Sequence, residues 1–198
     1  MKKKTGQKNI KNVVDFISEA GMLKRVARSG WSVLGVQNPE SVADHSFRCA
    51  VISFTLAHLE KANAHRALLM ALFNDIHEAR LTDLHKMAQR YIDTTQPDDK
   101  AFHDQVSALP GPLGDSLTAM HKEYVEQKTK ESVIARDADI LECLIQAKEY
   151  HEFGYAQAHK FMQKAPGFLR TKSAKLLWKH AKKADLNDWW VALSDFKR

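Results

Sequence analysis

The sequence has no apolar run long enough to cross a membrane, and its 2 cysteines show no CxxC spacing. Cys49 and Cys143 lie in apolar helical stretches, which is typical of reduced core thiols and predicts no disulfide framework. No apolar run follows the basic start at residues 1–4, so we expect no secretory signal. Together these absences predict a cytoplasmic protein that has no membrane partner.

Signals for β-strands are also missing, because no alternating pattern persists for more than a few residues and no internal repeat is present. Apolar residues recur instead at helical spacing, so the predicted class is all-α. At 198 residues, we expect one domain over residues 1–198. Its core should occupy roughly residues 10–155, with additional C-terminal helices over roughly residues 156–196.

A nucleic-acid-binding signature is absent as well, although the net charge is +6. Much of the excess lies at the N-terminus and between Arg170 and Lys183. A solvated lysine surface explains this charge, and we therefore expect no nucleic-acid partner. The alternative that Lys172–Lys183 forms a helix for binding a partner or nucleic acid stays open.

The pattern predicts helices over residues 10–24, 42–61, 63–80, 115–128 and 131–153, and shorter ones near 99–108, 156–163, 171–183 and 186–194. Ser41 and Asp44 have the spacing of a capping box at the start of the second helix, and Asn63 is suited to cap the third. Gly154 should end the long helix. Residues 28–39 are predicted to form a loop.

Three of these helices carry ionisable side chains on faces that are otherwise apolar. His45 falls on the inward stripe of the second helix, and Asp75 lies on the apolar face of the third. At least one of Asp137 and Asp139 must approach the core, and we interpret Asp137 as a surface partner of Arg136. Buried ionisable groups are rare unless they pair or hold a metal, which favours one polar site inside a helical bundle.

One histidine and two aspartates from three helices are suited to a divalent cation. Such an ion would lower the pKa of bound water and polarise a phosphoryl oxygen, while Glu78 is placed to hold or relay that water's proton. In the preceding loop, Arg28 is suited to phosphate oxygens and Trp31 to stacking on a base. Simpler alternatives stay open: a core histidine bonded to a carbonyl, a surface arginine and a packed tryptophan.

Five segments, residues 23–31, 38–48, 74–79, 82–84 and 137–142, resemble the HD-domain metal-dependent phosphohydrolases, and most closely their 5′-deoxynucleotidase branch. The resemblance implies an HD-domain-like helical bundle, a homodimer, and removal of the 5′-phosphate from (deoxy)nucleoside monophosphates. It also implies a divalent metal and the following functional residues: metal ligands His45, Asn74, Asp75 and Asp139, catalytic residues Glu78 and Asp83, and substrate-binding residues Arg28 and Trp31.

Asn74 departs from the family, whose members have a histidine at this position. An amide offers only a neutral oxygen, so we expect weaker metal affinity and a shift toward Mn²⁺ or Mg²⁺ rather than Zn²⁺ or Co²⁺. Three explanations are open: Asn74 still ligates, His77 substitutes for it, or the chain has lost activity and kept a nucleotide-binding or regulatory pocket. Retention of four acids favours the enzyme: Asp75, Glu78, Asp83 and Asp139.

Overall fold

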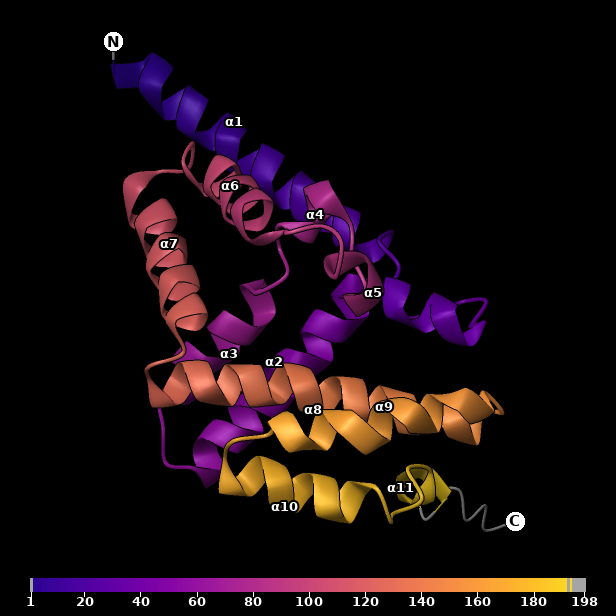
Figure 1. Ribbon diagram of the computed structural model, residues 1–198. Helices are drawn as coiled ribbons and strands as arrows, with labels where there is room; N and C mark the ends of the chain where they lie inside the picture. Colours follow the sequence, from indigo (N-terminus) through magenta and orange to yellow (C-terminus); the bar gives the residue numbers. More distant parts are fainter. Residues whose placement is uncertain (1, 192, 194–198) are drawn as a thin grey trace, which may run out of the picture.

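The computed structural model describes residues 2–191 and 193, and apart from one isolated bridge between Ala27 and Ser41 the described chain forms helices and turns without a strand (Figure 1). The predicted all-α class is therefore confirmed. The longer helices are α1 (Lys2–Ala20), α2 (Val42–Leu59), α3 (Ala64–Phe73), α6 (Thr95–Val106), α7 (Gly111–Glu126), α8 (Lys130–Glu152) and α10 (Lys172–Ala181).

Short helices connect these elements. They are η1 (Gly21–Lys24), η2 (Ser29–Leu34), α4 (Glu78–Leu81), α5 (Lys86–Gln89), η3 (Ala156–Ala158), α9 (His159–Lys164), η4 (Ala165–Phe168) and α11 (Asp188–Val191). Two backbone hydrogen bonds, from Arg28 to Glu40 and from Val42 to Val26, hold the ends of the loop that contains η2 together. The loop that sequence alone predicts over residues 28–39 is thus a closed turn around a 3₁₀ helix.

Helix α8 is the central element, and it packs against α2, α3, α7, α9 and α10 (Figure 1). Its apolar side chains face several neighbours at once, and Ile134, Leu141 and Leu144 are completely or almost completely buried. Helices α2 and α3 also pack closely on each other. A helix that is buried on several sides carries polar groups only where they find partners, which makes the acids of α8 informative.

The predicted helix ends are confirmed where a cap defines them. Ser41 and Asp44 form the capping box of α2, the Asn63 side chain accepts from the Arg66 amide at the start of α3, and Gly154 follows the end of α8 at φ 101°. At this positive φ a side chain would be strained, so glycine suits the position. Helix α7 begins at Gly111 rather than at residue 115, because a proline is tolerated in the first helical turn.

The third helix was predicted to continue to residue 80, but α3 ends at Phe73. A turn over residues 74–77 separates it from the short helix α4, which begins at Glu78. In the C-terminal part, the predicted stretch 186–194 is helical only over Asp188–Val191, and residues 192 and 194 lie outside the described chain. Within that chain, no helix is both long enough and apolar enough to span a bilayer.

Asp137 is not the surface partner of Arg136 that the sequence suggested. It is completely buried, and its carboxylate accepts hydrogen bonds from the Arg170 amide, the Thr171 amide and the Thr171 hydroxyl at 2.7–2.9 Å. Arg136 pairs instead with Asp139, at 3.2 Å. Asp137 therefore joins α8 to the start of α10, and the C-terminal helices pack on the central helix through this contact.

Candidate metal centre

His45 lies on α2 with 1% of its side chain exposed, and both ring nitrogens face carboxylates. Nδ1 lies 2.5 Å from the Glu142 carboxylate, while Nε2 lies 3.4 Å from Asp75 and 3.3 Å from Asp139. Three separate segments thus meet at one imidazole: α2, the turn after α3, and α8. The structure brings together the histidine and two aspartates that the sequence predicts as metal ligands.

The contact with Glu142 determines how His45 presents its ring. Nδ1–H donates to a carboxylate that itself accepts from the Arg48 guanidinium, at 2.8–2.9 Å. Glu142 is completely buried, so it needs these charged partners. A histidine whose Nδ1–H is held by a carboxylate offers Nε2 as a ligand, which is the common arrangement around protein-bound metals.

The charges in this cluster shift the pKa values of His45, Asp75 and Asp139 in the directions that favour the charged form of each group. Burial lowers the pKa of His45, but Cys49, Asp139 and Asp75 outweigh it and raise this pKa well above its usual value. Burial raises the pKa of Asp75 and Asp139, but hydrogen bonds to His45 outweigh it and lower both. A proton on His45 Nε2 therefore stabilises the two half-buried carboxylates of Asp75 and Asp139.

Asn74 and His77 lie beside this cluster, with different partners. The half-buried Asn74 amide donates to the Asp75 carboxylate at 2.6 Å. Its nitrogen therefore faces the cluster, and rotation of the amide would present its oxygen. His77 Nε2 lies 3.7 Å from Asp98 on α6. This contact directs His77 toward α6 and gives no support to the idea that it replaces a ligand at position 74.

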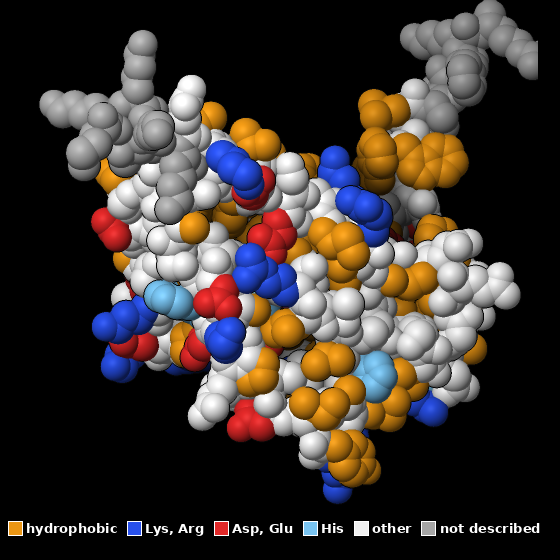
Figure 2. Space-filling view, turned by 90° about the horizontal axis from the view of Figure 1, so that it is seen from above, with side chains coloured by type: hydrophobic (Ala, Val, Ile, Leu, Met, Phe, Trp, Pro, Cys, Tyr) orange, Lys and Arg blue, Asp and Glu red, His pale blue; other side chains and the backbone are white. Residues whose placement is uncertain are grey.

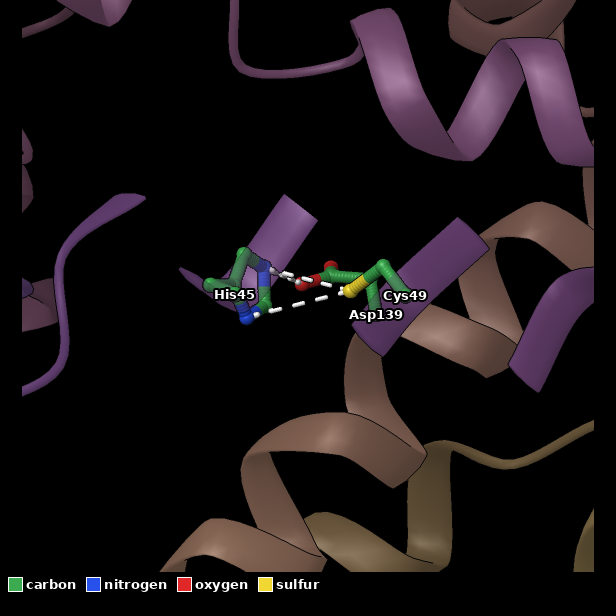
Figure 3. Close-up of side chains that lie close together, drawn as sticks. All are labelled: His45, Cys49 and Asp139. Atoms are coloured by element: carbon green, nitrogen blue, oxygen red, sulfur yellow. Dashed lines mark hydrogen bonds and ion pairs between the residues drawn. The ribbon is translucent and has the colours of Figure 1, made fainter. Parts of the chain in front are cut away.

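Cys49 also belongs to the cluster, although the sequence did not single it out as a site residue. Its sulfur lies 3.4 Å from His45 Nε2, and Figure 3 shows His45, Cys49 and Asp139 pointing toward one another. Ligand atoms of these three side chains all lie within 4.8 Å of one another. The spacing of four between His45 and Cys49 is the signal in the sequence, since it places both on one helix face.

Arg28 and Asp83 lie next to each other at the edge of the cluster. The Asp83 carboxylate accepts from the Ser29 amide at 2.7 Å and lies 3.9 Å from the Arg28 guanidinium. Burial lowers the pKa of Arg28, but the negative charges of Asp75, Asp83 and Asp139 raise it overall. Arg28 Nε is buried without a hydrogen-bond partner, so this cation has a donor left for an anionic ligand.

Glu78 is the first residue of α4, and its Oε2 is buried without a hydrogen-bond partner. Burial raises the pKa of Glu78 to about 10, and the charges of Asp75 and Asp83 act in the same direction. In the metal-free protein this carboxyl group is therefore neutral near pH 7. A perturbed acid beside a cluster of candidate ligands is a common feature of active sites.

Trp31 is 2% exposed and packs against Tyr150 and Phe161, with ring centroids 5.1 and 4.9 Å apart. Its Nε1–H donates to Glu40 at 2.9 Å. The structure therefore places Trp31 in the core, as the alternative of a packed tryptophan predicts, and not at a surface on which a base could stack. Its hydrogen bond instead fixes Glu40. Burial and the nearby Glu142 raise the pKa of Glu40 to about 7.

Comparisons with known proteins agree with this geometry. The family model described as "HD domain" matches residues 20–178. The chain belongs to the HD-domain family. The 5′-deoxynucleotidase HDDC2 of Xenopus laevis is 31% identical over 161 residues, which cover 81% of this chain and 75% of the relative. Human HDDC2 is 29% identical over 143 residues, covering 72% of this chain and 70% of the relative.

Solved structures share the HD-domain fold. A conserved hypothetical protein from Pyrococcus furiosus is 33% identical, with a TM-score of 0.75 over 86% of this chain and 99% of the other. A predicted metal-dependent phosphohydrolase from Magnetospirillum magnetotacticum is 20% identical, with a TM-score of 0.72 over 90% of this chain and 93% of the other. At 20% identity the second likeness supports the fold alone.

The cluster in this HD-domain chain fits a divalent cation. His45 presents Nε2 to two acids at 3.3–3.4 Å, a spacing typical of groups that share one ion. The Oε2 atom of Glu78 is buried and has no partner among the described residues. Glu142 is a second residue that sequence reasoning missed, although it follows Asp139 by one helical turn and therefore lies on the same face of α8.

Proposed function

We propose that this HD-domain protein is a metal-dependent phosphohydrolase that removes the 5′-phosphate of deoxynucleoside monophosphates. The observation that carries the proposal is the pair of contacts from His45 Nε2 to Asp75 and Asp139, made while Nδ1 is held by Glu142. The relatives named as 5′-deoxynucleotidases support the substrate class. We further propose that residues 1–198 form a single domain.

His45, Asp75 and Asp139 would hold the divalent ion, with the Asn74 amide oxygen as a weaker donor. Such an ion, whether Mn²⁺, Co²⁺ or Mg²⁺, supplies Lewis acidity at the phosphoryl group and lowers the pKa of the attacking water. Glu142 keeps the His45 ring in the orientation that exposes Nε2. His45 and Glu142 are buried, whereas Asp75 and Asp139 keep 13% and 22% of their side chains exposed, so the ion would face solvent through the two aspartates.

Glu78 is the proposed proton carrier. Its buried Oε2 has no hydrogen-bond partner within the described chain, so it is available to a water or a leaving oxygen. In the metal-free protein the pKa of Glu78 is raised to about 10, and a bound cation would bring it down toward the working pH. A carboxyl group that can be ionised or protonated near neutral pH suits general acid–base catalysis.

Arg28 is the proposed phosphate-binding residue, and Asp83 positions it. The Asp83 carboxylate holds the Ser29 amide at 2.7 Å and lies near the Arg28 guanidinium, so it fixes the start of η2 beside the cluster. The unpartnered Nε of Arg28 then has a phosphate oxygen as its natural acceptor. Trp31 acts indirectly, because it belongs to η2 itself, packs into the core and donates a hydrogen bond to Glu40.

The direct test is phosphate release from a panel of deoxynucleoside and ribonucleoside 5′-monophosphates with Mn²⁺, Co²⁺ or Mg²⁺. We expect turnover with at least one ion, and loss of at least a hundredfold in the folded variant Asp139→Asn. Absence of turnover with every ion in a folded sample would reject the enzyme. If nucleotides then raise the melting temperature, the alternative of a binding or regulatory protein takes its place.

We also propose a cytoplasmic homodimer. Ile10, Val14 and Ile17 form an exposed apolar stripe on α1, at 54–66% exposure, which a second copy would cover. Figure 2 shows hydrophobic side chains at the surface between basic and acidic ones on the face seen from above. Both cysteines are free, which suits a reducing compartment. Light scattering should give the mass of two chains, and a monomer at all concentrations would reject the dimer.

A further inference from the structure

Glu40 lies at the end of the loop over residues 28–40 that contains η2, and its groups make hydrogen bonds in three directions. Its carbonyl oxygen accepts from the Arg28 amide at 3.0 Å. Its own amide donates to the Tyr150 hydroxyl on α8 at 2.8 Å. Its carboxylate accepts from the Trp31 indole N–H at 2.9 Å. A single residue therefore joins the start of the loop, the 3₁₀ helix inside it and the central helix of the protein.

These contacts also determine where the backbone of Arg28 lies. Arg28 immediately precedes η2, and its carbonyl oxygen accepts from the Trp31 amide at 3.3 Å. Trp31 is in turn buried against Tyr150 and Phe161. The backbone of Arg28 is thus connected to Glu40 twice, directly by one hydrogen bond and indirectly through Trp31.

The Arg28 side chain has few restraints of its own. Within the described chain its guanidinium forms an ion pair with Asp83 at 3.9 Å, a distance too long for a hydrogen bond. Its Nε is buried and has no hydrogen-bond partner among the described residues. The direction in which the guanidinium points therefore depends on how firmly the loop beneath it is held.

The Glu40 carboxylate also lies beside the candidate metal ligand His45. One of its oxygens, one Glu142 oxygen and a ring nitrogen of His45 lie within 4.8 Å of one another. His45 Nδ1 is already engaged by Glu142 at 2.5 Å, so Glu40 borders this ligand without binding the ion itself. The same carboxylate therefore contacts the loop of Arg28 on one side and borders the metal centre on the other.

We propose that Glu40 is a positioning residue, which holds Trp31 and thereby orients Arg28 toward a phosphate bound at the metal centre. The proposal rests on the proposed function, because it assigns a role at the same site. Glu40 acts here through the reach of its acceptor oxygen and not through its charge. A loosely held Arg28 binds the phosphate of the substrate and of the transition state equally less well, so KM changes more than kcat.

The simpler alternative is that Glu40 only satisfies a buried indole N–H. Trp31 is 2% exposed, and a buried donor without an acceptor is costly, so loss of the contact lowers the stability of the protein in either case. Kinetic constants separate the two roles, because a purely structural contact leaves KM unchanged in a folded variant. Two substitutions separate reach from charge: glutamine keeps the reach and loses the charge, whereas aspartate keeps the charge and is one methylene shorter.

The experiment measures kcat and KM with Mn²⁺ for the best-hydrolysed deoxynucleoside monophosphate, in the full-length protein, Glu40→Asp and Glu40→Gln. In Glu40→Asp we expect KM to rise at least about fivefold and kcat to change less than about twofold. Glu40→Gln should keep both constants within about twofold of the unchanged protein, and Mn²⁺ affinity should be equal in all three. An unchanged KM in folded Glu40→Asp, or a raised KM in Glu40→Gln alone, would overturn the proposal.

A double-mutant cycle with Arg28→Ala tests the route to the phosphate. Because Glu40 acts through Arg28, Glu40→Asp should raise KM less than about twofold in the Arg28→Ala background. An equal rise in both backgrounds would refute the proposal and leave the enzyme intact. Trp31→Phe removes the indole N–H and keeps an aromatic ring, so it should reproduce the rise in KM, and it decides the matter if Glu40→Asp does not fold.

Failure of the proposed function gives a different result from failure of this role for Glu40. If the unchanged protein turns over no nucleotide, the proposed function is rejected. The dissociation constant of the tightest-bound nucleotide of the panel, measured by calorimetry with Mn²⁺, then replaces KM in the same comparisons. We expect the same fivefold weakening in Glu40→Asp. Absence of nucleotide binding to the unchanged protein would reject both proposals.

Discussion

His45 Nδ1 and Glu142 Oε2 lie 2.5 Å apart in the interior of the protein, and this contact orients the imidazole at the centre of the candidate site. Replacement of the carboxylate by an amide in Glu142→Gln removes the charge that holds the ring and its tautomer. We expect Mn²⁺ or Co²⁺ affinity, measured by isothermal titration calorimetry, to fall about 10–100-fold. Glu149→Gln is the matched control, because Glu149 also accepts from Arg48 but does not contact His45. Equal affinity in Glu142→Gln and the unchanged protein would show that the ring needs no such support.

Glu78→Gln should reduce activity and stabilise the metal-free protein. The folded-state pKa of Glu78, about 10, lies above its unfolded value. The stabilising effect of its protonated form is therefore complete below the unfolded pKa and is lost as the pH rises toward 10. The glutamine side chain does not ionise, so the variant does not lose this stability as the pH rises. Its free energy of unfolding should exceed that of the unchanged protein by a margin that grows between pH 5 and 9.

For Glu78→Gln we expect phosphate release to fall about 10²–10⁴-fold. At pH 8 with a chelator present, its melting temperature should exceed that of the unchanged protein by about 2–4 °C for each kcal/mol gained. Thermal denaturation of both proteins at several pH values shows directly how their difference in stability changes with pH. A stability difference that is constant with pH would mean that Glu78 titrates normally and does not carry a proton in the reaction.

Asn74→His tests whether position 74 faces the metal. An imidazole there would add a stronger donor than the amide, so we expect tighter binding on the order of tenfold, equivalent to about 1.4 kcal/mol. Turnover should rise with metal occupancy at limiting metal. Metal content by elemental analysis and phosphate release are the two measurements. If both stay unaltered, Asn74 lies outside the ligand set.

Asp137→Asn should destabilise the protein without changing its chemistry. The buried carboxylate accepts three hydrogen bonds from Arg170 and Thr171, and an amide group would turn a donor toward one of these donors. We expect a loss of about 1–3 kcal/mol in the free energy of unfolding, measured by urea denaturation. The exposed Asp93, which accepts from the Thr95 amide, gives the control variant Asp93→Asn with little change. A fall in kcat/KM in the folded variant would instead connect Asp137 to the active site.

Periodicity and caps predicted most of this fold, since Ser41, Asn63 and Gly154 act through neighbours within a few residues. The same local pattern placed His45, Asp75 and Asp139 on inward faces, and the structure brings them together. The break after Phe73 was missed, because residues 74–80 keep helical periodicity and contain neither glycine nor proline. The turn there gives Asn74 and Asp75 their place beside the cluster.

The errors at α8 have a different physical cause. Asp137 finds its donors 33 and 34 residues further along the chain, and no local signal shows that such donors exist. The assignment of Arg136 to its immediate neighbour was a local error, because residues three apart on a helix face each other and Asp139 is therefore the better-placed partner. The packing of Trp31 depends on Tyr150 and Phe161, which lie on distant helices.

The most direct test of the metal centre is the anomalous diffraction of a crystal grown with Mn²⁺ or Co²⁺. We predict one strong anomalous peak per chain within bonding distance of His45 Nε2 and Asp139, with Asp75 as a neighbour. No peak at this cluster in an ion-saturated crystal, or a peak only at surface residues, would contradict the account.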